Sequence, residues 1–232
     1  MNEAAENEMK DTTIKRSVVP AVILYSVLFY SAWFIWEFWG KGAVDKAVGN
    51  ELLAQFVKSG IIKGLVWVLP AVCLIRYFRD EVFIRQKEMF TNRVNLWKYL
   101  PVFLGFSLYL LLGAWITRGK LAISDSFGCK ELIIVLFVGI TEEMVFRGWL
   151  LNVTVRENRK WLPILINAGM FLLIHFPNWI ANGTFLATMT SGNALAVPIL
   201  SVIFSWTFLK SKNIWVPITL HMHWDLLVFL FY

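Results

Sequence analysis

Apolar residues occur along this chain in long runs that are separated by short polar connectors. A helix needs about 20 mainly apolar residues to cross a bilayer, and such runs recur from residue 17 to the last residue. The pattern predicts seven transmembrane helices, at residues 17–39, 60–77, 100–117, 131–151, 161–181, 194–209 and 214–232. Residues 1–232 are therefore expected to form a single all-α domain, a polytopic membrane helix bundle without a separate soluble part.

Two of the connectors have helical patterns of their own. Between the second and third spans, RDEVFIRQKEMFTNRVNLWKY mixes charged and apolar side chains, which is typical of an amphipathic helix at the membrane interface. In the 41–59 connector, apolar residues recur at helical spacing and indicate another short helix. The first 16 residues are polar, and the apolar run after them is too long for the core of a signal peptide, so we expect it to remain as the first span.

The overall composition is that of a membrane protein. Of the 232 residues, 58% are hydrophobic and 16% are charged, and the mean hydropathy of +0.61 is well above that of a soluble domain. The two cysteines, Cys73 and Cys129, belong to no CxxC or Cys/His cluster. The sequence therefore implies neither a disulfide framework nor a structural zinc site.

The net charge of +6 follows the expected topology. Connectors on the side of the N-terminus hold fourteen Lys and Arg residues, against six on the other side. Because cytoplasmic connectors carry the excess of these residues, we expect a multi-pass protein of the cell membrane with its N-terminus in the cytoplasm and its C-terminus outside. The bases form no single soluble face, so nucleic acid is not an expected partner.

Ionisable residues lie deep in three of the predicted spans, where a charged side chain costs at least about 2.5–3.5 kcal/mol. They are Glu142, Glu143 and Arg147 in span 131–151, His175 in span 161–181, and His221, His223 and Asp225 in span 214–232. At about 1.5 Å of rise per residue, both glutamates, His175, His221 and Asp225 fall within roughly 6 Å of one plane. Three helices thus bring titratable groups to one depth, which predicts a functional site.

Helical geometry divides the charges of span 131–151. Glu143 and Arg147 are i,i+4 neighbours, about 40° apart on the helix, and this spacing favours an ion pair. Glu142 lies about 140° from Arg147 on the same helix and is less well compensated. We therefore expect Glu143 and Arg147 to organise the site and Glu142 to be its chemical group, a candidate general base.

The same geometry selects among the histidines. His221 and Asp225 are i,i+4 neighbours, whereas His223 points about 200° away from His221 and is left outside the site. On span 161–181, one stripe of the helix contains Asn167, Phe171, His175 and Asn178. His175 joins the site on this basis, with Phe171 and Asn167 as secondary candidates.

Two chemical interpretations fit this set of side chains, because GxSxG and HExxH are absent and no serine or cysteine accompanies it. In the first, Glu142 and His175 deprotonate a water that attacks an amide carbonyl, and His221 with Asp225 stabilises the oxyanion. In the second, the same side chains ligate a divalent metal that generates hydroxide.

Two functions other than hydrolysis are also compatible with buried polar groups. The cluster could hold helices together in a non-catalytic scaffold. It could also relay protons in a transporter, although the chain shows no inverted repeat.

Three motifs are shared with a known family. EEMVFR (142–147) matches EExxxR, FLLIH (171–175) matches FxxxH, and HMHWD (221–225) matches HxxxN/D. In their order and spacing the chain resembles the CPBP family of intramembrane glutamic endopeptidases, which includes the type II CAAX prenyl endopeptidases and the bacterial Abi proteins. The resemblance covers about residues 131–232, which we take as the protease core.

The resemblance implies a protease without metal or cofactor, whose intramembrane cavity opens to the cytoplasm and to lipid. By similarity, Glu142 and His175 activate water and His221 with residue 225 forms an oxyanion hole. The implied substrate is a hydrophobic or membrane-bound peptide or protein. Asp225 stands where CAAX-processing members have asparagine, and an ionised carboxylate would repel an oxyanion. The alternative is a non-catalytic scaffold, or an immunity or partner-binding protein of the same fold.

Overall fold

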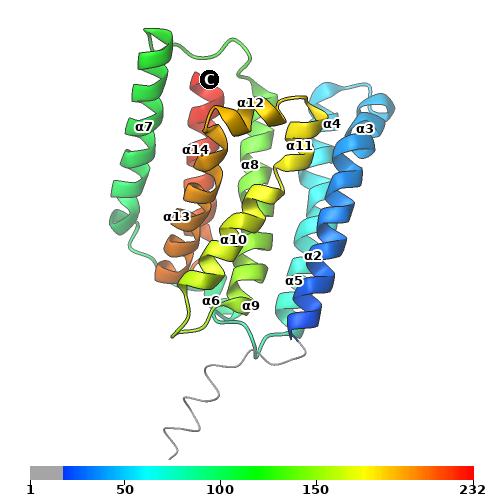
Figure 1. The fold of residues 1–232 in the computed structure, drawn as a ribbon, viewed down its shortest axis with the longest axis vertical. Helices are drawn as coiled ribbons and strands as arrows, with labels where there is room; N and C mark the ends of the chain where they lie inside the picture. The colour runs from blue at the N-terminus through cyan, green and yellow to red at the C-terminus, as the bar shows by residue number, and fades with distance from the viewer. Residues whose placement is uncertain (1–17) are drawn as a thin grey trace, which may run out of the picture.

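A computed structural model describes residues 18–232, which are all-helical, with no strand among them. The predicted polar tail, residues 1–16, lies outside the described residues. Figure 1 shows the helices as a bundle with most axes roughly aligned. In order, with η for 3-10 or π-helical stretches, they are α2 (Val18–Ile35), η1 (Trp36–Gly40), α3 (Lys41–Ala47), α4 (Glu51–Phe56), η2 (Val57–Ile62), η3 (Gly64–Val68), α5 (Leu69–Tyr77), α6 (Gln86–Thr91), η4 (Leu96–Tyr99), α7 (Leu100–Arg118), α8 (Cys129–Glu143), η5 (Met144–Leu151), α9 (Asn152–Thr154), α10 (Trp161–Leu173), α11 (Phe176–Ala181), α12 (Phe185–Thr190), η6 (Asn193–Leu195), α13 (Ala196–Ser211) and α14 (Trp215–Phe231).

Five helical segments among the described residues are long and apolar enough to cross a membrane. They are Val18–Ala47, Glu51–Tyr77, Leu96–Arg118, Trp161–Ala181 and Asn193–Ser211. The predicted spans 131–151 and 214–232 are helical too, but three buried charged residues interrupt the first, and the second, α14, has only 17 residues. The count of seven spans therefore stays a prediction. The two segments that fall short are those that carry most of the candidate site.

The first two long helices extend further than predicted. Predicted spans 17–39 and 60–77 become Val18–Ala47 and Glu51–Tyr77, which are joined by a short turn. Asn50 ends that turn, and its side-chain oxygen accepts a hydrogen bond from the backbone of Leu53 at 2.9 Å, as an N-cap does. The 41–59 segment is therefore mostly helix, as its periodicity indicated. Its residues lengthen the walls of the bundle instead of forming a separate connector.

The predicted amphipathic helix between the second and third spans is much shorter than expected. Only α6 and η4 are helical there, because the segment buries its apolar side chains in the core. Ile84 and Met89 are fully buried. The buried side chain of Asn152 accepts from the backbone N–H of Ile84 at 2.7 Å and donates to its carbonyl at 2.8 Å. The segment thus closes one end of the bundle and is not a continuous interfacial helix.

The helix that carries the first motif forms the centre of the bundle. All eight residues of η5 are buried, and its neighbours include α5, α10 and α13, while α8 packs against α14 and α4. The outer surface, by contrast, exposes large apolar side chains along the long helices, for example Leu24 and Leu28 on α2 and Leu104 and Leu108 on α7. An apolar exterior around a polar centre is the arrangement that a lipid environment favours.

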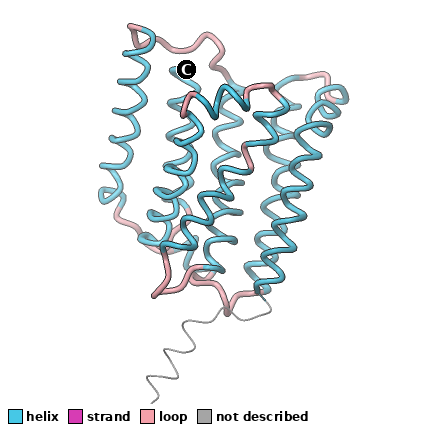
Figure 2. Tube along the Cα trace, in the orientation of Figure 1, coloured by secondary structure: helices cyan, strands magenta, loops and turns pink. Residues whose placement is uncertain are grey.

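Span 161–181 is broken next to its candidate histidine. Helix α10 ends at Leu173, and α11 begins at Phe176 with Pro177 in its first turn. Pro177 has no N–H to donate to the carbonyl four residues earlier, that of Leu173, and its ring clashes with that carbonyl, which interrupts the regular α-helix here. Figure 2 shows the interruption as a short loop between the two helices. His175 lies in the break.

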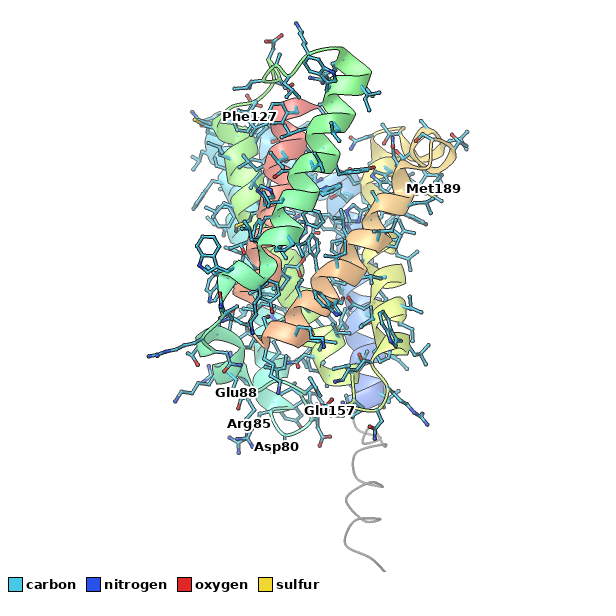
Figure 3. The ribbon with its side chains drawn as sticks, turned by 90° about the vertical axis from the view of Figure 1, so that its left-hand side faces the viewer. Asp80, Arg85, Glu88, Phe127, Glu157 and Met189 are labelled. Atoms are coloured by element: carbon cyan, nitrogen blue, oxygen red, sulfur yellow. The ribbon has the colours of Figure 1, made fainter. Side chains whose placement is uncertain are left out.

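The bundle has two chemically different ends, and the residues labelled in Figure 3 lie at one or the other of them. The end that we call the C-terminal end carries Tyr232, the loop with Phe127 and the segment with Met189. The end that we call the basic end carries the connectors 78–99, 155–160 and 212–214, with Asp80, Arg85, Glu88 and Glu157 labelled there. Helix α2 begins at the basic end and reaches the C-terminal end through α3.

Candidate active site

The adjacent glutamates of the first motif lie where the α-helix changes to π-helical spacing. Glu142 and Glu143 are the last residues of α8, and η5 begins at Met144. Their exposed fractions are only 6% and 0%. π-helical stretches inside α-helices occur frequently at functional sites because they reorient side chains. Because adjacent residues of an α-helix point about 100° apart, the two carboxylates meet different partners.

Glu143 is the acceptor at the centre of a buried hydrogen-bond network. Its Oε1 atom accepts from Arg147 Nη1 and from His221 Nδ1, both at 2.9 Å. Arg147 Nη2 donates in turn to the carbonyl and the hydroxyl oxygen of Ser201, at 3.1 and 2.8 Å. The predicted Glu143–Arg147 pair is thus present. The network connects three helical segments, because Ser201 belongs to α13 and His221 to α14.

Two aromatic rings enclose the guanidinium of Arg147. Its carbon atom lies 4.6 Å from the ring centroid of Phe171 and 5.3 Å from that of Phe204. Phe171 also contacts His221 edge-on, with ring centroids 5.9 Å apart. A cation against aromatic faces is stabilised where water is excluded. Phe171 therefore packs beneath the charged network, which is consistent with its place as a secondary site residue.

Glu142 faces a cavity instead of this network. The cavity has a volume of about 430 Å³, and its wall combines the chemical groups Glu142, His175, Asp225 and Lys63 with apolar side chains. The apolar part of the wall includes Trp33, Trp36, Ile134, Val138, Ile174, Val228 and Phe229. Pockets of this size with a few polar groups on apolar walls are typical of ligand sites.

The carboxylate of Glu142 keeps its hydrogen-bonding capacity. Within residues 18–232 neither of its oxygens accepts a hydrogen bond, and Oε2 is buried. Oε1 lies 3.9 Å from Lys63 Nζ, and Oε2 lies 4.0 Å from His221 Nε2. Both distances exceed that of a hydrogen bond. A buried carboxylate that is unbonded but close to cations can accept a proton from a bound molecule.

His175 is held by the backbone of its own helix. Its Nδ1 atom lies 2.8 Å from the carbonyl oxygen of Phe171. A carbonyl oxygen can only accept, so Nδ1 carries the proton and donates. Nε2 makes no hydrogen bond within the described part of the chain. In the neutral ring this nitrogen is an acceptor, and the bond to Phe171 fixes which nitrogen it is.

His221 and Asp225 are close but are not hydrogen-bonded. His221 Nε2 lies 3.5 Å from Asp225 Oδ2, and the firm partner of His221 is Glu143, on another helix. Asp225 lines the cavity, and its side chain is 21% exposed. The predicted i,i+4 neighbours therefore do lie together, with the carboxylate of Asp225 on the cavity side.

Two residues of the motif-bearing helices lie elsewhere. His223 contacts Ser107 of α7 at 2.9 Å, so it lies outside the site, as the helical angle predicted. Asn167 donates to the carbonyl oxygen of Phe146 at 2.9 Å and is buried. It lines a different groove, nearer the basic end, and not the cavity. The stripe that linked it to His175 is divided by the break between α10 and α11.

Lys63 is the residue that sequence reasoning missed. It lies in the cavity wall, it is 9% exposed, and it is in the middle of the helix Glu51–Tyr77. The sequence did distinguish this residue. Twenty of the 22 Lys and Arg residues fall in or next to predicted connectors, and the other two are Arg147 and Lys63. Near the mouth, Glu37 was missed as well. It pairs with Lys41 at 2.6 Å and accepts from Asn178 at 3.0 Å.

The cavity extends toward the C-terminal end of the bundle. From Glu142 its wall follows α8 back through Val138 and Ile134, and it ends beside Lys41 and Lys58. Lys41 is the first residue of α3 and Lys58 the second residue of η2, which follows α4. Figure 1 shows α3 and α4 at the C-terminal end. A cytoplasmic N-terminus and a cytoplasmic mouth were both expected, but the N-terminal helix begins at the opposite end. With a cytoplasmic N-terminus, a cavity that opens beside Lys41 and Lys58 would open outside the cytoplasm, so both expectations stay predictions.

The donor set does not fit a divalent metal well. Within residues 18–232, no group of three or more His, Cys, Asp and Glu side chains is arranged to hold one. Glu143 Oε1 already accepts from Arg147 and His221. The ammonium of Lys63 stands 3.9 Å from Glu142, where it would repel a second cation. The site has its own resident positive charges.

A known protein family matches part of this chain. Residues 129–227 match the family described as type II CAAX prenyl endopeptidase Rce1-like. No curated protein and no solved structure matches the chain. The matched residues include all three motifs and every predicted site residue on α8, η5, α10 and α14. Rce1-like proteins are proteases, and the apolar helices agree with a multi-pass membrane protein. Residues 129–227 of this chain are therefore similar to the Rce1-like, CAAX protease-like family.

Proposed function

We propose that this protein is an intramembrane endopeptidase that hydrolyses peptide bonds of a hydrophobic or membrane-associated peptide with water activated by Glu142 and His175. One observation carries the proposal. Glu142 and His175 come from different helices and line the same cavity, and each keeps an atom free to accept a hydrogen bond, Oε2 and Nε2 respectively. Groups that served only to hold helices together would be bonded to each other, as Glu143 and Arg147 are.

In the proposed reaction the water donates a hydrogen bond to each of these two acceptors, and Glu142 takes and then returns its proton. A water bound between them gives a proton to Glu142 as its oxygen adds to the amide carbon of the substrate. The carbon–nitrogen bond of the resulting tetrahedral intermediate then breaks, and the protonated Glu142 gives the proton to the leaving amine. The products are a carboxylic acid and an amine, and the carboxylate of Glu142 is restored.

The remaining charged residues have positioning roles in this proposal. Glu143 fixes the ring of His221 through Nδ1, and Arg147 fixes Glu143. His221 Nε2 is then directed toward Asp225 and Glu142. A carboxylate only accepts hydrogen bonds, so Asp225 acts on the orientation of His221 and not as an oxyanion donor.

The cavity wall supports a proposal for the class of substrate and for its side of access. Trp33, Ile134, Val138 and Phe229 offer apolar surface to the side chains of a hydrophobic peptide. The mouth lies at the C-terminal end, opposite to the end with most Lys and Arg residues. By the positive-inside rule, the protein would accept its substrate from the extracytoplasmic side.

The test begins with membrane proteomics of cells that carry the wild type or Glu142→Gln. We expect an uncleaved precursor to accumulate only with the variant. With a peptide taken from that precursor and purified protein in detergent, Glu142→Gln and His175→Gln should each lower kcat by about 10²–10⁴-fold, the usual contribution of acid–base groups. Melting temperatures should stay near that of the wild type.

His223→Gln is the matched control, because it makes the same change on α14 outside the cavity. It should cleave as the wild type does. Full cleavage by Glu142→Gln would refute the proposal. If no precursor accumulates and the cellular phenotype of the protein survives Glu142→Gln, the scaffold alternative is correct.

A further inference from the structure

Lys63 is a buried ammonium group without a hydrogen bond. Its Nζ atom lies 4.9 Å from the ring centroid of Trp33 and 4.7 Å from that of Trp67. Its nearest carboxylate oxygen is Glu142 Oε1 at 3.9 Å. No hydrogen bond from Lys63 is present within residues 18–232. Aromatic faces compensate part of the charge, and all three of its N–H donors remain available.

The position of Lys63 along its helix is not one at which topology requires a lysine. Twelve residues separate it from Glu51 and fourteen from Tyr77, the ends of its helix. At about 1.5 Å of rise per residue, these ends are about 18 and 21 Å away. The stem of Lys63 does not extend toward a helix end, as lysines near helix ends do, because its ammonium lies between Trp33 and Trp67. A cation kept at this depth is usually functional.

Neutralising Glu142 is an incomplete explanation as well. The same site contains a closed ion pair, Arg147 with Glu143, at 2.9 Å. The Lys63–Glu142 separation of 3.9 Å is too long for a hydrogen bond. The two tryptophans hold the ammonium at this separation on the cavity wall. Its donors therefore stay free beside the carboxylate that is proposed to activate water.

We infer that Lys63 is the oxyanion-binding group of this site. This inference rests on the proposed function. A carbonyl carbon attacked by water from Glu142 must lie close to Glu142, so its oxygen comes within reach of the Lys63 ammonium. As the tetrahedral intermediate forms, negative charge develops on that oxygen, and Lys63 donates hydrogen bonds to it without giving up a proton. When the carbon–nitrogen bond breaks, the carbonyl re-forms and the charge on its oxygen disappears.

Lys63 also resolves the difficulty at position 225. The resemblance assigns residue 225 an oxyanion role, but an ionised aspartate has no hydrogen to donate. The ammonium of Lys63 supplies the missing donor from another helix, Glu51–Tyr77, outside the segment 129–227 that matches the family. The N-terminal helices then take part in catalysis and do not only enclose the site.

Lys63→Met tests the inference, because methionine keeps the length of the side chain and removes its charge. The assay uses purified full-length protein in detergent, with the internally quenched peptide that the wild type cleaves best in a library of apolar sequences. We expect kcat to fall by about 10²–10³-fold, as on loss of an oxyanion donor, and KM to change little. Lys63→Arg should recover part of the rate. Lys130→Met is the control, since Lys130 pairs with Glu51 at 2.6 Å and does not line the cavity, and it should match the wild type.

The pH profile separates this role from a purely electrostatic effect on Glu142. If Lys63 acts only through Glu142, Lys63→Met shifts the profile of kcat along the pH axis and keeps the plateau of the wild type, which would overturn the inference. A plateau lowered at every pH supports it. If Lys63→Met does not fold, the plateau of Lys63→Arg decides in the same way. Failure of Glu142→Gln to reduce cleavage would refute the proposed function itself, whatever Lys63→Met does.

Discussion

His221 is bonded to the first motif through Glu143 and not through Glu142. Its Nδ1 atom lies 2.9 Å from Glu143 Oε1, whereas its Nε2 atom comes no nearer than 4.0 Å to Glu142 Oε2. The two adjacent glutamates therefore have separate tasks. Glu143 joins α8 to α14, which leaves the carboxylate of Glu142 unbonded in the cavity.

The Glu143–Arg147 network should be essential for stability. Arg147→Ala removes a fully buried cation and leaves Glu143 buried without its partner, which in other proteins costs about 3–5 kcal/mol. We expect a large drop in the melting temperature in detergent. Arg147→Lys should rescue it poorly, because lysine cannot bond Glu143 and Ser201 with two separate nitrogens. Arg85→Ala is the control at the exposed basic end. An unchanged melting temperature of Arg147→Ala would show that the network is dispensable.

The sequence predicted the contacts among the buried polar residues better than the lengths and boundaries of the helices. The i,i+4 spacing of Glu143 and Arg147 on one helix is a local property, and the pair is present. The exclusion of His223 also required only the helical angle and is confirmed by its contact with Ser107. Such predictions succeed because they depend on the geometry of a single helix.

Features that depend on packing between helices were not predictable in this way. Nothing local distinguishes Glu143 from Glu142 as the partner of His221, since that choice depends on how α14 packs against α8. Asn167 follows the helical stripe of His175, but Pro177 and the break at His175 separate the two environments. The prediction of a long amphipathic helix was wrong for a similar reason, because Ile84 and Met89 are buried in the core.

Asp225 should tolerate replacement by asparagine. If its role is to orient His221, the amide of Asp225→Asn can still contact Nε2, and it adds a donor on the cavity side. We expect kcat at least equal to that of the wild type. Asp225→Ala loses one polar contact and should reduce kcat by up to about tenfold, the equivalent of a modest hydrogen bond. Loss of all activity in Asp225→Asn would show that the negative charge itself takes part in the reaction.

The side of the membrane on which the cavity opens can be read from a native thiol. Cys129 is exposed at the start of α8, at the C-terminal end where the mouth lies. Serine replaces Cys73, the other exposed thiol, so that Cys129 is the only thiol left. If the C-terminal end is extracytoplasmic, a membrane-impermeant maleimide should label Cys129 in intact spheroplasts, as shown by a mass shift on a gel.

The reciprocal reporter is Glu157→Cys in a protein that also carries Cys73→Ser and Cys129→Ser. Glu157 is exposed at the basic end (Figure 3), so this thiol should react only after the membrane is permeabilised. The opposite pattern would place the mouth in the cytoplasm and the N-terminus outside, against the distribution of Lys and Arg. Because the cavity and both reporters belong to one bundle, either result fixes the side from which Glu142 can receive a substrate.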